Sequence, residues 1–236
     1  MSLAVLMITL SLGSWIAWGL YLLGRGVLAF LWRRLPQSET RPYGRANLLA
    51  VPLALAHPMF VAKGLLPCMV RPGAAAVQDV MDASLPAGLA GLRPVLLQYF
   101  GLRASSSETE IRQGVENLLR YQWYRMDMTQ LGPQDDLRDG VAFAVARVAF
   151  ATRAAALLGW LPVMLHEQVM QLNAQRAAAC FSSWEEYGRA YARGRQQWIV
   201  RSRPDLLGAG LHEGELERWL TSRLHPWCRF SWPTSH

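Results

Sequence analysis

A stretch of 22 residues without a charged side chain, from Leu3 to Gly24, constrains this chain more than any other feature of its sequence. A helix rises about 1.5 Å per residue, so a stretch of this length crosses the ~30 Å hydrocarbon core of a bilayer. The backbone polar groups of such a stretch must bond to one another in lipid, which predicts a helix. Trp15, Trp18 and Tyr21 lie in its second half, as expected for anchoring at a membrane interface. We therefore predict an N-terminal transmembrane anchor within residues 1–32.

A cleaved signal peptide is the alternative for the same stretch. A signal peptide begins with a basic region and ends at a cleavage site made of small residues. The chain has no Lys or Arg before Arg25, and Gly24-Arg25-Gly26 is a poor cleavage context. The sequence therefore favours an anchor that is retained.

The positive charge of the chain lies next to this apolar stretch. The formal net charge is +7, of which the first 71 residues carry +6 and the remaining residues +1. A nucleic-acid-binding protein would carry that charge on its folded domain, because contacts to phosphates supply its affinity. We therefore expect no nucleic-acid partner and take the lipid bilayer as the partner of the basic region.

The orientation in the membrane follows from five Arg between positions 25 and 45. Positively charged flanks stay on the cytoplasmic side, which places the C-terminal part in the cytoplasm. The three cysteines (Cys68, Cys180 and Cys228) are odd in number and widely spaced, which fits a reducing compartment without structural disulfides. We expect a single-pass protein of the bacterial inner membrane with a cytoplasmic C-terminal domain.

Two breaks containing proline divide the rest of the chain, at residues 33–47 and 67–76. We assign 33–76 to a basic linker with an apolar interfacial segment and 77–236 to a helical domain. The apolar run 48–62 contains Pro52 and Pro58 and, at 15 residues, is short for a membrane span. A second pass or a re-entrant hairpin is the alternative for this run.

The signals in residues 77–236 predict an all-α domain made of several packed helices. Ser107 with Glu110, and Ser183 with Glu186, have the spacing of a capping box at a helix start. No alternating run is long enough for a sheet. The apolar run 141–165 is interrupted by Arg147 and Arg153, whose charges are costly in lipid, so we expect core helices there. From position 184 onward, aromatic residues and a glycine recur at helical spacing and predict one packed helix face: Trp184, Tyr187, Tyr191, Gly194 and Trp198.

The segment from about Leu96 to Ile199 resembles the uncharacterised bacterial domain known as domain of unknown function 1266. That family shows a late Phe-x-Ser-Trp-Glu-Glu motif followed by Gly-Arg-x-x-Trp, which is intact here as Phe181, Ser183, Trp184, Glu185, Glu186, Gly194, Arg195 and Trp198. Its early motif is present loosely as Phe100-Gly101-Leu102. Its middle Trp-Asp-x-x-Arg is changed, since Phe143 and Ala144 replace the first two residues and Arg147 matches. The resemblance implies a compact, mainly helical domain and no particular activity.

The polar end of the predicted aromatic face is the best candidate for a binding site. Glu185, Glu186 and Arg195 can line a cleft together with Arg147 and bind an anionic or peptide ligand, with Trp184 and Trp198 beside them. The competing interpretation is that Glu186 caps the helix and that the Arg residues are solvated or paired.

Other groups of ligand-type residues have simpler explanations. His166 beside Glu167 has the residue types for acid–base chemistry, although a single His on a helix is more often structural. Aspartates at 135, 136 and 139 are more typical of a helix start than of a cation site. A set of zinc-ligand types has a spacing that matches no standard site: His212, Glu213, His225 and Cys228. We predict no catalytic residue, no metal and no cofactor.

Together these observations predict a membrane-anchored bacterial protein whose cytoplasmic helical domain acts as a protein-interaction module, with a partner that the sequence does not identify. The ten tryptophans suit an interaction surface. The alternative is a membrane-associated enzyme or toxin-like effector that uses the Glu185, Glu186, Arg147 and Arg195 group. Whether the domain is an enzyme is left open.

Overall fold

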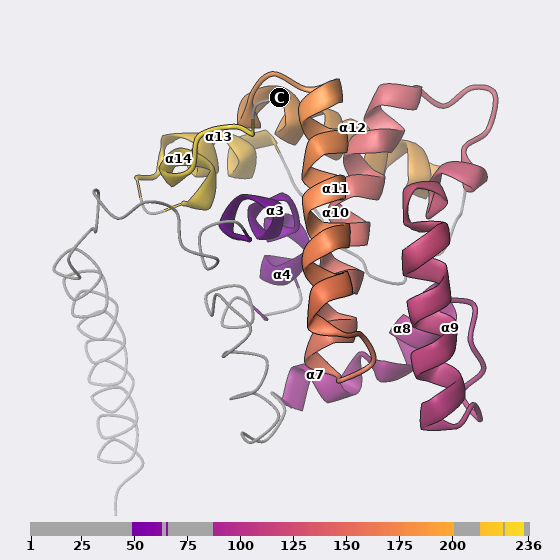
Figure 1. Cartoon of the computed structure of the whole chain (residues 1–236). Coiled ribbons are helices and arrows are strands. Elements are labelled where there is room, and N and C mark those ends of the chain that lie inside the picture. Colours follow the sequence, from indigo (N-terminus) through magenta and orange to yellow (C-terminus); the bar gives the residue numbers. More distant parts are fainter. Residues whose placement is uncertain (1–48, 63–64, 66–86, 201–212, 224, 234–236) are drawn as a thin grey trace, which may run out of the picture. The chain divides into compact units, whose positions relative to one another are not determined.

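The computed structural model describes residues 49–62, 65, 87–200, 213–223 and 225–233, and all regular elements of these residues are helices (Figure 1). The predicted all-α fold is confirmed for this part of the chain. The predicted transmembrane anchor within 1–32 lies outside the described residues.

The described helices keep the labels of Figure 1. The N-terminal helices are α3 (Ala50–Leu55), α4 (His57–Ala62), α7 (Ala87–Gly91), α8 (Arg93–Tyr99) and α9 (Glu108–Tyr121). Two short 3₁₀ turns follow, η1 (Trp123–Arg125) and η2 (Met128–Gln130). The C-terminal helices are α10 (Leu137–Leu157), α11 (Val163–Cys180), α12 (Trp184–Val200), α13 (Glu213–Thr221) and α14 (Pro226–Arg229).

Helix α10 is the centre of the domain. It begins after Asp136, whose side chain accepts a hydrogen bond from the backbone N–H of Asp139, so the helix start predicted from the aspartates at 135, 136 and 139 is confirmed. Helices α11, α12, α3 and α4 pack around it. In the described part of the chain, α10 alone is long and apolar enough to cross a membrane, yet 94% of its most apolar window is buried inside the protein. This burial is what we expect of the core helix of a domain.

The apolar run 48–62 forms the two short helices α3 and α4. Leu53, Leu55 and Phe60 are buried, and both helices contact α10. The C-terminal part of the chain covers the same region: Trp227 donates its indole N–H to the carbonyl oxygen of Ala54 at 2.8 Å. Residues 49–62 therefore pack into the helical domain, whereas the division predicted from sequence places 33–76 outside it.

In Figure 1, helices α8 and α9 lie on one side of the central helices, and α3, α4, α13 and α14 lie on the other. Helix α9 contacts α11, and α3 contacts α10, α11 and α14. The capping box predicted at the start of α9 is confirmed, with Ser107 and Glu110 bonding reciprocally. The cavity described below is lined by residues of α8 and α9, on the first of these two sides.

Candidate functional site

A cavity of about 360 Å³ lies beside α10 and the C-terminal end of α12. Most of its wall comes from residues 122–130, the connecting segment between α9 and the loop that leads to α10. Helices α8, α9, α10 and α12 supply the rest. The lining residues are Gln98, Tyr99, Leu118, Gln122, Arg125, Met126, Asp127, Thr129, Gln130, Arg147 and Trp198. A cavity of this volume is in the range of small-ligand sites.

A buried ion pair forms part of the cavity wall. The Nε of Arg147 lies 3.2 Å from a carboxylate oxygen of Asp127, and only 3% and 4% of the two side chains are exposed. Removing two charges from water is costly, so such a pair persists only with good geometry and further hydrogen bonds. The contacts that hold this pair at the cavity wall come from aromatic residues around it.

Three aromatic rings hold the guanidinium of Arg147. Its central carbon lies 5.0 Å from the ring centre of Tyr99, 5.3 Å from that of Phe143 and 4.7 Å from that of Trp198. A cation near the face of an aromatic ring is attracted by the ring quadrupole, most strongly when both are desolvated. The rings fix the position of Arg147 from α8, α10 and α12 together.

Tyr99 also bonds to the acid of the pair. Its hydroxyl donates to the second carboxylate oxygen of Asp127 at 2.9 Å. Burial raises the pKa of Tyr99 well above its usual value, and the nearby negative charge of Asp127 raises it further. The phenol therefore stays protonated and acts as a hydrogen-bond donor.

Asp127 has an unusual backbone conformation. Its φ is +68° with ψ −30°, and among the described residues it is the one position other than glycine with a positive φ. It stands between η1 and η2, two turns too short to hold it by helical hydrogen bonding. The carboxylate, through Arg147 and Tyr99, thus helps to fix the connecting segment.

Of the six site residues predicted from sequence, the structure brings Arg147 and Trp198 together at this cavity. Trp184 lies near the other end of α12, stacked on Trp227 with ring centres 5.6 Å apart. Arg195 lies on α12 and is partly buried.

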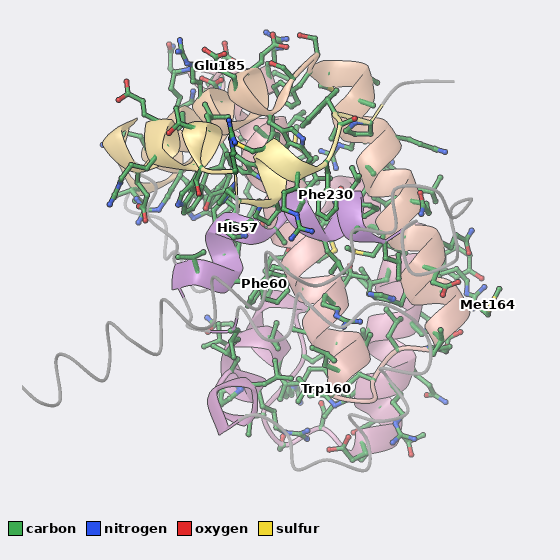
Figure 2. All side chains as sticks on the ribbon, turned by 90° about the vertical axis from the view of Figure 1, so that its left-hand side faces the viewer. His57, Phe60, Trp160, Met164, Glu185 and Phe230 are labelled. Carbon is green, nitrogen blue, oxygen red and sulfur yellow. The ribbon has the colours of Figure 1, made fainter. Side chains whose placement is uncertain are left out.

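The two predicted glutamates have other partners. Glu185 pairs with Arg189 at 2.7 Å, and both side chains are exposed; Figure 2 shows Glu185 at the edge of the molecule, far from Trp160. Glu186 accepts hydrogen bonds from the backbone N–H of Ser182 at 2.7 Å and from Arg138. Hydrogen bonds from Ser182 lower the pKa of Glu186, so it stays ionised. The predicted box is confirmed in one half, since Ser183 Oγ accepts from the backbone N–H of Glu186 at 3.1 Å, while the Glu186 carboxylate accepts from Ser182 in place of Ser183.

The other candidate groups have structural roles in the described residues. Asp139 pairs with Arg193 through two hydrogen bonds of 2.8 Å, and Asp136 caps α10. His166 is buried, which lowers its pKa to about 3. At neutral pH it is uncharged and enclosed, which does not suit an acid–base group.

The zinc-ligand types predicted near the C-terminus do not form a metal site in the described residues. No group of three His, Cys, Asp or Glu side chains is close enough there. His212 lies outside the described residues. His225 accepts from the backbone N–H of Trp227 and stacks on Trp219, and Cys228 donates to the carbonyl of Leu220.

Sequence reasoning missed Asp127 and Tyr99. The resemblance pointed to an acid three residues before Arg147, where this chain has Ala144, but the structure supplies the carboxylate from a different segment. One local signal was available, because Asp127 is an acid placed between Met126 and Met128. The pairing itself joins residues far apart in the chain, which local patterns do not reveal.

The comparison with protein families identifies a family for this chain. The model of a protein family described as "Protein of unknown function (DUF1266)" matches residues 68–232, more than half of the chain. Neither a curated protein nor a solved structure matches the chain.

Proposed function

The chain belongs to the DUF1266 family of proteins of unknown function, and from this premise we propose that it is a membrane-tethered helical domain that binds a partner through the cavity beside Arg147 and Trp198. The tether is the uncharged stretch Leu3–Gly24, with its basic flank on the cytoplasmic side of a bacterial inner membrane. The domain then works close to the cytoplasmic face of that membrane.

The observation that carries the binding proposal is the buried pair of Arg147 and Asp127 at the wall of a 360 Å³ cavity. A buried ion pair is weak support for stability, because apolar residues of similar volume often do as well, so its position at a cavity wall favours a binding role. The lining carries two positive side chains, Arg125 and Arg147, and one negative, so it suits a group with negative charge.

The rim of the cavity suits a polar partner. Gln98, Gln122 and Gln130 are exposed lining residues, and each amide offers both donors and an acceptor. Trp198 and Leu118 add an apolar surface inside. This combination of an apolar wall and a few convergent polar groups is typical of binding sites.

An enzyme that uses Glu185 and Glu186 has less support. Those carboxylates pair with Arg189 and Arg138, and Glu186 is twelve residues, or about 18 Å along the helix, from Trp198. We therefore favour binding over catalysis.

A photo-cross-linking residue at Gln130 of the full-length protein, in intact bacterial cells, tests the binding proposal. We expect a discrete adduct from Gln130 and none from a matched probe at Met164, which is 65% exposed and points away from the domain (Figure 2). The same adducts from both positions, or none from Gln130, would contradict it.

Alkaline extraction of membranes tests the tether. We expect the full-length protein to remain in the membrane and a Leu12→Arg, Ile16→Arg double variant to be released, because charges in the bilayer centre are costly. Release of the unchanged chain would rule out the anchor.

A further inference from the structure

We propose that Asp127 occupies the anion subsite of its own cavity, and that the carboxylate of a ligand displaces it from Arg147. This inference rests on the proposed binding function and names the chemical class of the ligand. It makes Asp127 a built-in competitor whose release rearranges the connecting segment 122–130.

The donors around Asp127 form a carboxylate-binding site. The Nε of Arg147 lies 3.2 Å from one of its oxygens in an ion pair, and the hydroxyl of Tyr99 donates a hydrogen bond to the other. The rings of Tyr99, Phe143 and Trp198 keep the guanidinium in place, so this site does not depend on Asp127 for its shape. An incoming carboxylate therefore meets a guanidinium and a hydroxyl donor that are already in place.

Exchange of one carboxylate for another avoids the main cost of opening a buried pair. Loss of Asp127 alone leaves Arg147 buried without its counter-charge, which is strongly unfavourable. A ligand that brings its own carboxylate restores that charge in the same place. The charge balance of the wall therefore selects a carboxylate over a neutral group of equal size.

Asp127 is also the wall residue best suited to leave. Its backbone φ of +68° is strained for any residue except glycine, and such strain persists only where surrounding contacts hold it. Two of the hydrogen bonds that flank it are long, at 3.4 Å from Met126 N–H to the carbonyl of Trp123 and 3.2 Å from Gln130 N–H to the carbonyl of Asp127. Departure of the carboxylate therefore relieves strain and frees a weakly bonded segment.

Isothermal titration of the full-length protein in detergent with benzoate tests the proposal. We expect Asp127→Asn to bind benzoate at least tenfold more tightly than the wild type, because the amide keeps the shape but no longer competes for Arg147. Glu185→Gln is the matched control: it removes one negative charge from an exposed pair near the other end of α12 and should leave the affinity unchanged. Equal or weaker binding by Asp127→Asn would overturn the proposal.

A second variant protects this test against failure to fold. Asp127→Gly removes the carboxylate and also the strain, since glycine accepts a positive φ. We expect it to show the same gain in affinity. Should both variants fold and neither gain affinity, Asp127 is not a competitor.

Hydrogen exchange of the wild type separates displacement from simple binding. Saturating benzoate should speed exchange in residues 122–130, because the segment loses its hold on Arg147, while exchange in α10 stays slow. Slower exchange in 122–130 would mean that the ligand binds beside Asp127 without replacing it, which contradicts the proposal.

A pair of tripeptides, with a free and with an amidated C-terminus, identifies the source of the carboxylate. Tighter binding of the free peptide than of benzoate points to the chain end of a protein partner, and tighter binding of benzoate points to a small molecule; either supports the proposal. Measurable binding of both peptides with equal affinity overturns it, because the carboxylate would then contribute nothing. The Gln130 cross-link decides the proposed function separately, since a partner without a carboxylate is still captured there.

Discussion

The two halves of α12 present the same kind of aromatic face to opposite kinds of neighbour. In the first half, Trp184 and Tyr187 pack on rings from the C-terminal segment, with Trp227 at 5.6 and 5.8 Å. In the second half, Trp198 packs on the buried guanidinium of Arg147 at 4.7 Å. Aromatic residues at helical spacing therefore predict that a helix face is buried. Whether that face forms core or lines a site depends on the residues that pack against it.

The largest loss of stability should come from removing Arg147, which packs on Trp198 in the second half of α12. Arg147→Met leaves Asp127 buried without its counter-charge, so we expect a loss of about 3–5 kcal/mol in the free energy of unfolding. The counterpart in the other half is Tyr187→Phe, which removes a 2.7 Å hydrogen bond to the carbonyl of Leu55 and should cost about 1–3 kcal/mol. Urea unfolding followed by circular dichroism measures both.

The double variant Arg147→Met, Asp127→Asn serves as the control, because it removes both charges and keeps a residue that tolerates the positive φ at position 127. It should recover more than half of the stability that Arg147→Met loses. No recovery would mean that Arg147 stabilises the fold mainly through its rings and not through the pair.

The second comparison uses the two glycines of α12. A Cβ at Gly194 would overlap the backbone carbonyl of Asp139 at the start of α10, which cannot move without shifting the helix. A Cβ at Gly188 would meet side-chain atoms of Leu216 and Trp227, which can shift more easily than backbone. We expect Gly194→Ala to destabilise by about 2–3 kcal/mol and Gly188→Ala by about 1 kcal/mol, as measured by urea unfolding.

The control for both glycines is Gly91→Ala, where a Cβ meets nothing within 4 Å. It should be neutral or slightly stabilising, because alanine favours the helix. A loss at Gly188 equal to that at Gly194 would show that the two halves of α12 are packed with the same rigidity.

Much of the fold could be predicted because its signals are local. The starts of α9 and α10 lie at Ser107 and Asp136, where short-range hydrogen bonds mark the helix ends. The charges of Arg147 and Arg153 correctly predicted a core helix and not a membrane span in the apolar run 141–165. The packing of 49–62 into the domain was harder to predict, because an apolar sequence is the same whether its side chains contact lipid or protein.

The site could be predicted only in part, because its contacts join distant positions. Arg147 and Trp198 were candidates, yet Tyr99 and Asp127 come from other elements and their pairing leaves no periodic pattern. Glu185 and Glu186 are neighbours in sequence of Trp184, but the helix carries them away from the cavity. Local motifs therefore located the helix of the site and not its chemistry.

Acidification should lower the free energy of unfolding through two buried histidines that lie among the rings near the first half of α12. Burial lowers the pKa of His57 to about 4 and that of His225 to about 3, and their ring centres lie 4.1 Å apart. Unfolded histidine binds its proton near pH 6.5, so the unfolded state gains protons first, and stability falls below that pH until the folded pKa is reached, about 4 for His57 and about 3 for His225. Between pH 7 and pH 5 we expect a loss of about 2 kcal/mol per buried histidine.

His57→Phe tests this assignment, because it keeps a ring against Trp219 and removes one titrating group. Unfolding titrations at pH 7 and pH 5 should show a pH-dependent loss smaller by about 2 kcal/mol than in the wild type. His166 is buried on α11 and also has a lowered pKa, so its share of the pH-dependent loss should remain in His57→Phe. An unchanged pH-dependent loss in His57→Phe would place the acid sensitivity elsewhere.

The smallest effect should come from Glu186, at the start of the ring-packed half. Glu186→Gln keeps the shape but weakens the bonds to Ser182 and Arg138, so we expect a fall in melting temperature of roughly 2–4 °C and no change in cross-linking at Gln130. Glu185→Gln, whose exposed pair is screened by solvent, should shift the melting temperature less. Loss of the Gln130 adduct in Glu186→Gln, with an unchanged melting temperature, would instead show that both halves of α12 belong to one binding surface. Because its bonds run to the start of α12 and to α10, we expect Glu186 to act on stability alone.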